Sequence, residues 1–232
     1  MPRIARIVLA LALAVHITWQ VIGGKPQARG ASLPPSVDPA WLQVVSFGEP
    51  IAFSQMLVLY LQAFDNQPGL SIPYTALDYE AVLGWLRAAR TLDPRSHYPL
   101  MMAAQLYAQV PDARKARLML DFVHEEFLHD PDRHWRWLAH AAIVAKHRLN
   151  DLPLALRYAE DISRHAPGAL SWARQMRIFL LEDMGESQAA AVLLGGLLAN
   201  GEVTDPAEAR FLTERLDRLK ADENSSLPSK SR

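Results

Sequence analysis

Three prolines divide most of this chain into segments of nearly equal length. Pro94, Pro131 and Pro167 are separated by 37 and 36 residues, and Pro206 follows after a longer gap of 39. Proline ends an α-helix because it has no backbone N–H to donate and its ring clashes with the preceding turn. Helix-length stretches between such regular breaks are typical of stacked helix pairs, in which each unit buries its apolar face against its neighbours.

Composition supports a folded chain and excludes several classes of site. Half of the 232 residues are apolar, which is enough for one sizeable core or a short repeat array. The formal net charge of −1 argues against a protein that neutralises many phosphates, so we expect no nucleic-acid partner. The chain has no cysteine, which excludes disulfides, thiolate metal sites and cysteine nucleophiles.

An apolar run opens the chain. Residues 7–24 follow Arg3 and Arg6, and as a helix of about 18 residues they would extend about 27 Å, close to the thickness of a bilayer core. We therefore predict a single N-terminal transmembrane helix, with residues 1–24 as an anchor. A cleaved signal peptide is the alternative, since small residues lie within the run, but cleavage there would leave a short apolar region before the site.

The charges beside this run indicate its orientation. Arg3 and Arg6 precede it and Lys25 and Arg29 follow it, so the terminal amine favours a cytoplasmic amino terminus. The expected location is the inner (cytoplasmic) membrane as a single-pass protein, in contact with lipid through residues 7–24. For a Gram-negative source, the C-terminal domain would lie in the periplasm.

The rest of the chain is predicted to contain a linker, a helical domain and a tail. Residues 25–49 begin rich in Pro, Gly and Ser and are predicted to be a linker whose end docks on the body. A helical-repeat domain is expected over residues 50–221, and a disordered tail over residues 222–232. The residues expected to dock are apolar: Trp41, Leu42, Val44 and Val45.

Helical periodicity dominates the predicted domain. Apolar residues recur at three- and four-residue intervals, and no run shows the alternation of a half-buried strand, so the fold class is all-α. The predicted helices cover 51–64, 77–93, 96–108, 111–129, 132–148, 151–165, 169–184, 186–199 and 205–221. The first is apolar on most sides and should be well buried. The last is polar on much of its surface, which suits the cap of a stack.

The unit at 132–165 resembles a tetratricopeptide repeat. Trp135 and Leu138 stand in the W-x-x-L spacing of that family, with Ala139 where the family usually has glycine. Further positions fall near the expected small, larger and terminal proline sites: Ala155, Ala159 and Pro167. The departures are Ala142, where tyrosine is usual, and Ala166 in place of an acidic residue.

This resemblance covers residues 77–200 and implies an architecture. The family fold is a short right-handed superhelix of stacked antiparallel helix pairs with a concave peptide-binding face. The resemblance gives no activity, because repeat scaffolds serve many purposes.

Histidines gather in the middle of the chain without the spacing of a metal site. His124 and His129 are five residues apart rather than the four that a zinc metalloprotease helix needs, so they point about 140° apart. His140 and His147 share a face but lie about 10 Å apart along the axis, too far for one tetrahedral ion. With no G-x-S-x-G and no Gly-rich phosphate loop, we expect no catalytic residue, metal or cofactor.

The remaining candidate site is basic. With tetratricopeptide geometry, Arg133, Arg136 and His140 would face the concave surface, joined by Arg177 from the next unit. Arginines at such positions clamp carboxylates or acidic peptide segments. The alternative is that they are solvated or pair with Asp132 and Glu182. Trp135 and Trp137 lie on nearly opposite faces of one helix, so one should be in the core and the other a contact residue.

These observations predict a non-catalytic, membrane-tethered interaction scaffold of the bacterial cell envelope. It would bind a protein or peptide partner through the helical-repeat surface. One alternative is an accessory structural subunit of a multi-protein membrane complex, in which His16, Thr18 and Gln20 hydrogen-bond a neighbouring helix. A metal-dependent envelope enzyme built on the histidine-rich helices is the third and least favoured interpretation.

Overall fold

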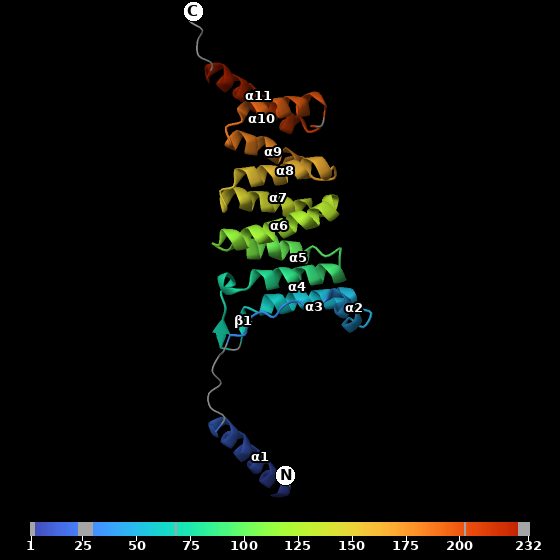
Figure 1. The fold of residues 1–232 in the computed structure, drawn as a ribbon, viewed down its shortest axis with the longest axis vertical. Helices are drawn as coiled ribbons and strands as arrows, with labels where there is room; N and C mark the ends of the chain where they lie inside the picture. Colours follow the sequence, from blue (N-terminus) through green and yellow to red (C-terminus); the bar gives the residue numbers. More distant parts are fainter. Residues whose placement is uncertain (1–2, 23–29, 68, 202, 227–232) are drawn as a thin grey trace, which may run out of the picture.

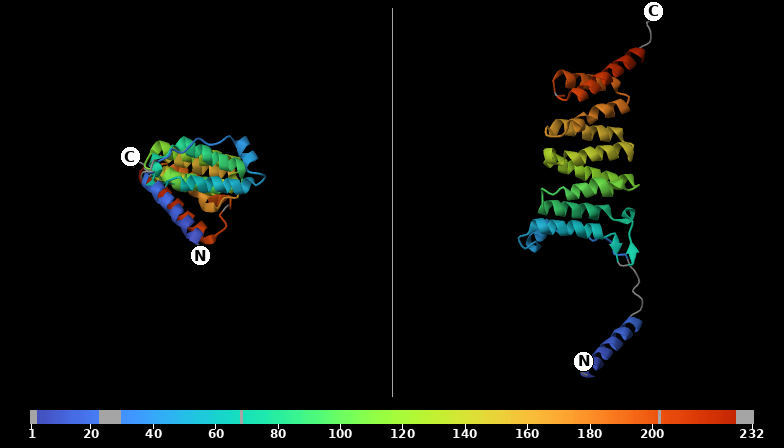
Figure 2. Two further views of the ribbon diagram at one scale, coloured as in Figure 1. Left: turned by 90° about the horizontal axis from the view of Figure 1, so that it is seen from below. Right: turned by 180° about the vertical axis from the view of Figure 1, so that it is seen from behind.

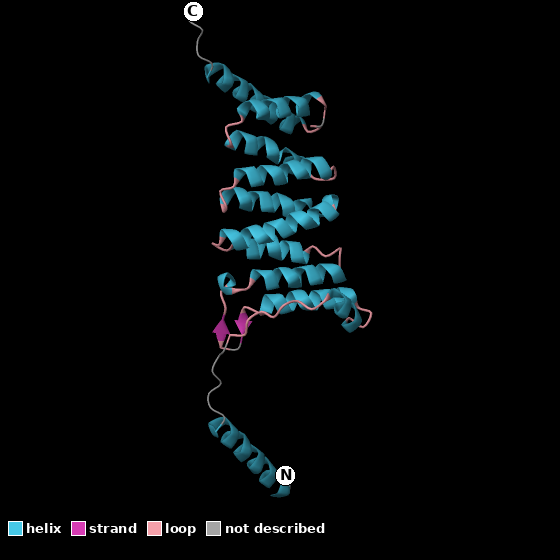
Figure 3. Ribbon diagram, in the orientation of Figure 1, coloured by secondary structure: helices cyan, strands magenta, loops and turns pink. Residues whose placement is uncertain are grey.

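The chain folds into an elongated stack of helices. The computed structural model describes residues 3–22, 30–67, 69–201 and 203–226. Successive helices form successive layers from one end of the stack to the other (Figure 1), and nearly all regular structure is helical (Figure 3). The all-α prediction is confirmed apart from one small antiparallel hairpin, in which β1 (Asn66–Gln67) pairs with β2 (Leu70–Ser71).

The helices follow the predicted segments closely. They are α1 (Arg3–Ile22), α2 (Pro39–Val45), α3 (Pro50–Ala63), α4 (Tyr79–Leu92), α5 (Tyr98–Met101), α6 (Ala113–His129), α7 (Pro131–His147), α8 (Leu152–His165), α9 (Ser171–Asp183), α10 (Ser187–Ala199) and α11 (Pro206–Ser226). Three short turns complete the set: the 3₁₀ turns η1 (Tyr74–Ala76) and η3 (Tyr107–Gln109) and the π-helical η2 (Met102–Leu106). The predicted helix at 96–108 is therefore one rod made of α5, η2 and η3.

The three regularly spaced prolines produce the same backbone geometry at each break. Asp93, Asp130 and Ala166 precede them, with φ of −135°, −148° and −117° and ψ of 86°, 78° and 74°. A residue before proline avoids the α region because of a clash with the proline ring. The chain therefore leaves each helix in the same way at each of these breaks.

Packing in the stack is sequential. Consecutive helices contact each other from α6 through α11, and α3 contacts α4. Polar contacts join residues one module apart: Arg87 to Glu125, His124 to Asp161 and Lys146 to Asp183, at separations of 38, 37 and 37 residues. A contact that recurs at one module length indicates a regular displacement from each module to the next.

The apolar interior is divided unevenly. One continuous core extends from Leu33 to Leu180 and contains the largest buried side chains, including Tyr107, Phe127 and Tyr158. A second, smaller cluster lies at the C-terminal end of the stack. It consists of Ile178, Ala190, Leu194, Leu212, Leu216 and Leu219.

The amino-terminal helix requires a correction. Of the described helices, none is both long and apolar enough to cross a membrane, so the predicted transmembrane helix is wrong. Arg3 and Arg6 lie inside α1, and polar residues interrupt its second half from His16 onward. The longest uninterrupted apolar run is thus 7–15, about half of the roughly 20 residues that a span needs. In Figure 1, α1 lies apart from the stack.

Part of the predicted linker touches the stack. Trp85 Nε1 of α4 donates a hydrogen bond to the Pro34 carbonyl oxygen at 2.8 Å. Of the four residues expected to dock, Leu42 is buried, whereas the other three are exposed. Residues 25–29 of the linker and 227–232 of the predicted tail lie outside the described residues, and α11 continues to Ser226.

Candidate partner-binding site

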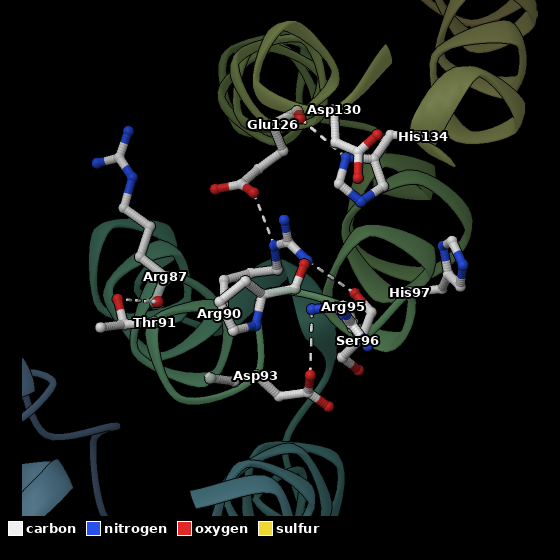
Figure 4. A network of polar contacts seen from close by, with 12 residues as sticks. Arg87, Arg90, Thr91, Asp93, Arg95, Ser96, His97, Glu126, Asp130 and His134 are labelled. Carbon is white, nitrogen blue, oxygen red and sulfur yellow. Dashed lines mark hydrogen bonds and ion pairs between the residues drawn. The ribbon is translucent and has the colours of Figure 1, made fainter. Parts of the chain in front are cut away.

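A buried ion pair lies where α4, α6 and α7 meet (Figure 4). Arg90 Nε of α4 donates to Glu126 Oε2 of α6 at 2.6 Å, and the two side chains are only 8% and 14% exposed. Arg90 Nη1 also donates to the carbonyl oxygens of Pro94 and Ser96, the latter at 3.0 Å. One guanidinium thus holds the α4–α5 turn against α6.

His134 completes this junction from the first turn of α7. Its Nδ1–H donates to the Glu126 carbonyl oxygen at 2.9 Å, and its side chain is fully buried. Burial lowers the pKa of His134; the hydrogen bond to Glu126 opposes this, and the positive charge of Arg90 adds to it. The imidazole is therefore neutral at neutral pH, with its proton on Nδ1.

Acidification is expected to destabilise the stack through His134. An unfolded histidine binds a proton near pH 6.5, whereas the lowered pKa of folded His134 delays binding to lower pH. Below about pH 6.5 the unfolded state therefore holds more protons, so the free energy of unfolding falls as the pH falls. Urea titrations at neutral and mildly acidic pH should show this loss.

The variant His134→Asn isolates the contribution of His134 to the acid-induced loss of stability. Its amide can still donate to the Glu126 carbonyl but cannot titrate. The pKa of His97 and that of His140 are also lowered, so the variant should reduce the acid-induced loss without abolishing it. An unchanged loss in the variant would contradict the assignment.

Two of the predicted binding residues lie on the exposed side of this junction. Arg133 Nε donates to Asp130 Oδ2 at 2.9 Å, and the Arg136 guanidinium lies 5.3 Å from the centre of the Trp135 ring. Trp135 is buried, which confirms that one of the two tryptophans belongs to the core. Both arginines are exposed on the first two turns of α7.

His97 lies beside these arginines. Burial lowers the pKa of His97, and the positive charges of Arg133 and Arg136 lower it further. The neutral ring accepts a hydrogen bond at Nδ1 from Trp137 Nε1 at 3.3 Å, and it meets the His134 ring edge to face at 5.9 Å. We call Arg133, Arg136 and His97 the basic edge.

His97 was missed in the sequence, although a signal for it was present. The chain reads Pro94-Arg-Ser-His97 at one break and Pro131-Asp-Arg-His134 at the next, so both histidines follow their proline by three residues. Equivalent positions in stacked modules lie in neighbouring layers. The repeated P-x-x-H pattern therefore predicts the contact between the two rings.

The other two predicted residues are not part of the basic edge. His140 is partly buried a turn further along α7, and burial lowers its pKa. Arg177 is partly buried on α9, with a buried Nε atom that has no hydrogen-bond partner in the described part of the chain. The described contacts join neither residue to Arg133 or Arg136.

The alternative was that the arginines are solvated or pair with Asp132 and Glu182, and the described contacts give these two carboxylates other partners. Asp132 Oδ1 accepts a hydrogen bond from the Gly168 backbone N–H at 2.8 Å, so it ties α7 to the following module. Glu182 accepts from Arg215 Nε at 2.8 and 2.9 Å, which ties α9 to α11. Both carboxylates thus hold neighbouring layers together and leave the α7 arginines to Asp130 or to solvent.

His124 has a structural role, because it connects α6 to α8. Its Nε2 lies 2.7 Å from Asp161 Oδ2 of α8, and its ring contacts that of Tyr158. Over the residues that the structure describes, no three His, Cys, Asp or Glu side chains are grouped so that they could hold a metal ion.

Comparison with known proteins identifies no relative from which a function could be inferred. No protein-family model, curated protein or solved structure matches the chain. The surface of the stack is therefore the basis for inferring what the protein does.

Proposed function

We propose that the protein is a non-catalytic interaction scaffold whose tetratricopeptide-like stack binds an acidic segment of a partner protein. The basic edge is the observation that carries this proposal. Arg133 and Arg136 are both exposed on α7, and their positive charges add to the effect of burial in lowering the pKa of His97. Arg136 forms no ion pair with any described carboxylate, so its guanidinium is available to a ligand. Guanidinium groups bind carboxylates through paired, charge-assisted hydrogen bonds.

The neighbouring surface adds an apolar contact. Trp172 of α9 is half exposed, and its ring lies 5.7 Å from that of Trp135, which also contacts Arg136. A basic group and an open aromatic ring therefore flank the same buried tryptophan. The matching ligand is an acidic peptide with an apolar or aromatic side chain near its carboxylates.

The arrangement of modules supports a binding scaffold. Sequential packing gives a long surface relative to chain length, and the repeated polar contacts between modules hold that surface rigid. At the junction itself, Arg90, Glu126 and His134 are occupied in joining helices rather than facing a reactant. This use of the polar side chains favours a role without catalysis.

Charge reversal at the basic edge should abolish most peptide binding. A fluorescent peptide rich in glutamate and carrying one tryptophan is expected to bind the full chain, as measured by fluorescence anisotropy. Arg136→Glu should weaken that binding by about tenfold or more, because it replaces an attraction with a repulsion at the contact. Higher salt should weaken binding to the unaltered chain.

Arg210→Glu is the matched control. Arg210 is exposed on α11 and its replacement changes the net charge by the same amount, so affinity should be nearly unchanged. Equal losses in both variants would show that overall charge alone drives association. No binding by the unaltered chain would reject the proposed function.

A further inference from the structure

The first layer of the stack exposes an apolar face. The buried residues of α3 are Ser54, Leu57, Val58 and Leu61, which face the next layer. The opposite side is exposed and carries a stripe at helical spacing: Ile51, Ala52, Gln55, Met56, Leu59 and Ala63. Tyr60 lies at the edge of this stripe, 41% exposed, with its ring against that of Trp85 of α4. The prediction of a helix buried on most sides is therefore wrong for this face, because α4 covers only one side of α3.

The segment before α3 exposes further apolar side chains at the same end of the stack. In α2 and the turn after it, Trp41, Val44 and Val45 are exposed, and Phe47 is 92% exposed. Figures 1 and 2 show α2 at the same end of the stack as α3, and α2 packs against α4. From residue 39 to residue 64 the sequence contains one charged residue, Glu49. We call α2, the turn after it and the exposed stripe of α3 the end face.

The C-terminal end of the stack has a charged surface rather than an apolar one. Among the exposed side chains described for α11, Phe211 is the single large apolar one, and charged residues surround it: Glu214, Asp217, Arg218 and Lys220. A polar outer layer is what keeps the end of a helical stack soluble. The stack is thus capped at its C-terminal end, while its N-terminal end is uncovered in the described chain.

We propose that two copies of this chain associate back to back through the end face. The centre of a protein–protein interface contains few charged residues, and in homodimers this centre is typically apolar. The end face has both properties. The eight large apolar side chains of the end face are 40–92% exposed, so each copy offers roughly 800 Å² of apolar surface, the usual share of one partner in a stable interface.

The asymmetry of the two ends limits the assembly to a dimer. When the same face of both copies meets, the contact is isologous and uses that face completely. The described exposed side chains of α11 form no second apolar face of this size, so the assembly closes. Beside the stripe, a hollow of about 310 Å³ lined by Val58, Leu59 and Tyr98 gives the partner copy a place to insert a side chain.

Sedimentation of the full chain tests the proposal. The unaltered protein should sediment at twice the mass of one chain, and Leu59→Glu should convert it to the mass of one chain, because the two-fold axis brings two new charges to one interface. Met56→Glu serves as a second variant, and circular dichroism confirms that each is folded. Phe211→Glu, which makes the same change at the other end, should stay dimeric.

Cross-linking locates the contact, since the chain has no cysteine of its own. Leu59→Cys treated with a flexible bis-maleimide should give linked pairs of chains, whereas Asp217→Cys on α11 should not. A monomeric unaltered protein, or a dimer that survives both glutamate variants, would overturn the proposal. Linkage within one chain between Val15→Cys of α1 and Leu59→Cys would also overturn it, by showing that α1 occupies the face.

Discussion

Replacing Glu126 with alanine is expected to lower the free energy of unfolding by about 3–5 kcal/mol. The variant leaves the Arg90 guanidinium charged in a site where its side chain is 8% exposed. Its hydrogen bonds to Pro94 and Ser96 satisfy only part of its donors and none of its charge. Urea denaturation followed by tryptophan fluorescence measures the loss.

The neighbouring ion pair is a control of the same kind on the same helices. Arg87 pairs with Glu125 between α4 and α6, but the two side chains are 52% and 51% exposed. Because water solvates each charge when its partner is removed, Glu125→Ala should cost less than about 1 kcal/mol. Comparable losses for the two alanine variants would show that burial does not decide the strength of these contacts.

A double substitution tests the cause of the Glu126 effect. In Arg90→Met with Glu126→Leu, neither charge is buried and the volume is nearly kept, so most of the lost stability should return. If the double variant is as unstable as Glu126→Ala, the loss comes from missing contacts rather than from an unpaired charge.

The fold was largely predictable because its determinants are local. The breaks at Pro94, Pro131 and Pro167 act on the residue before them, and the N-caps Asp78, Asp112 and Asp151 bond to the first turn of their own helices. Both signals are readable within a few residues. The helix bounds therefore match the predictions to within a few positions.

Other parts of the fold depend on packing. The rod at 96–108 contains the π-helical η2, whose residues, Met102–Leu106, have no local feature that distinguishes them from ordinary helix formers. The exposure of the α3 stripe was also hidden, because apolar composition indicates that a helix tends to be buried but not that a covering element is present.

The contacts of the candidate site likewise divide into those that are local in sequence and those that depend on packing. Arg133 and Asp130 are three residues apart at the start of one helix, so their pairing could have been predicted from the sequence, although the sequence analysis named Asp132 instead. Arg90 and Glu126 are 36 residues apart, and their contact depends on the exact displacement between modules. The resemblance predicted that Arg133, Arg136, His140 and Arg177 face one surface. Arg133 and Arg136 are exposed on α7, whereas His140 and Arg177 are partly buried, which depends on the packed structure.

Phe127→Ala is expected to cost about 3–5 kcal/mol, comparable to the loss of Glu126. Phe127 is 0% exposed in the larger core, so its removal leaves a cavity that the rigid neighbouring layers cannot close. Leu128 is the next residue of α6 and is 51% exposed, so Leu128→Ala should change stability by less than about 1 kcal/mol. Both variants can be compared in urea by near-ultraviolet circular dichroism. Similar midpoints for the two would mean that α6 is rotated from the orientation described, and with it the face that carries Glu126 toward Arg90.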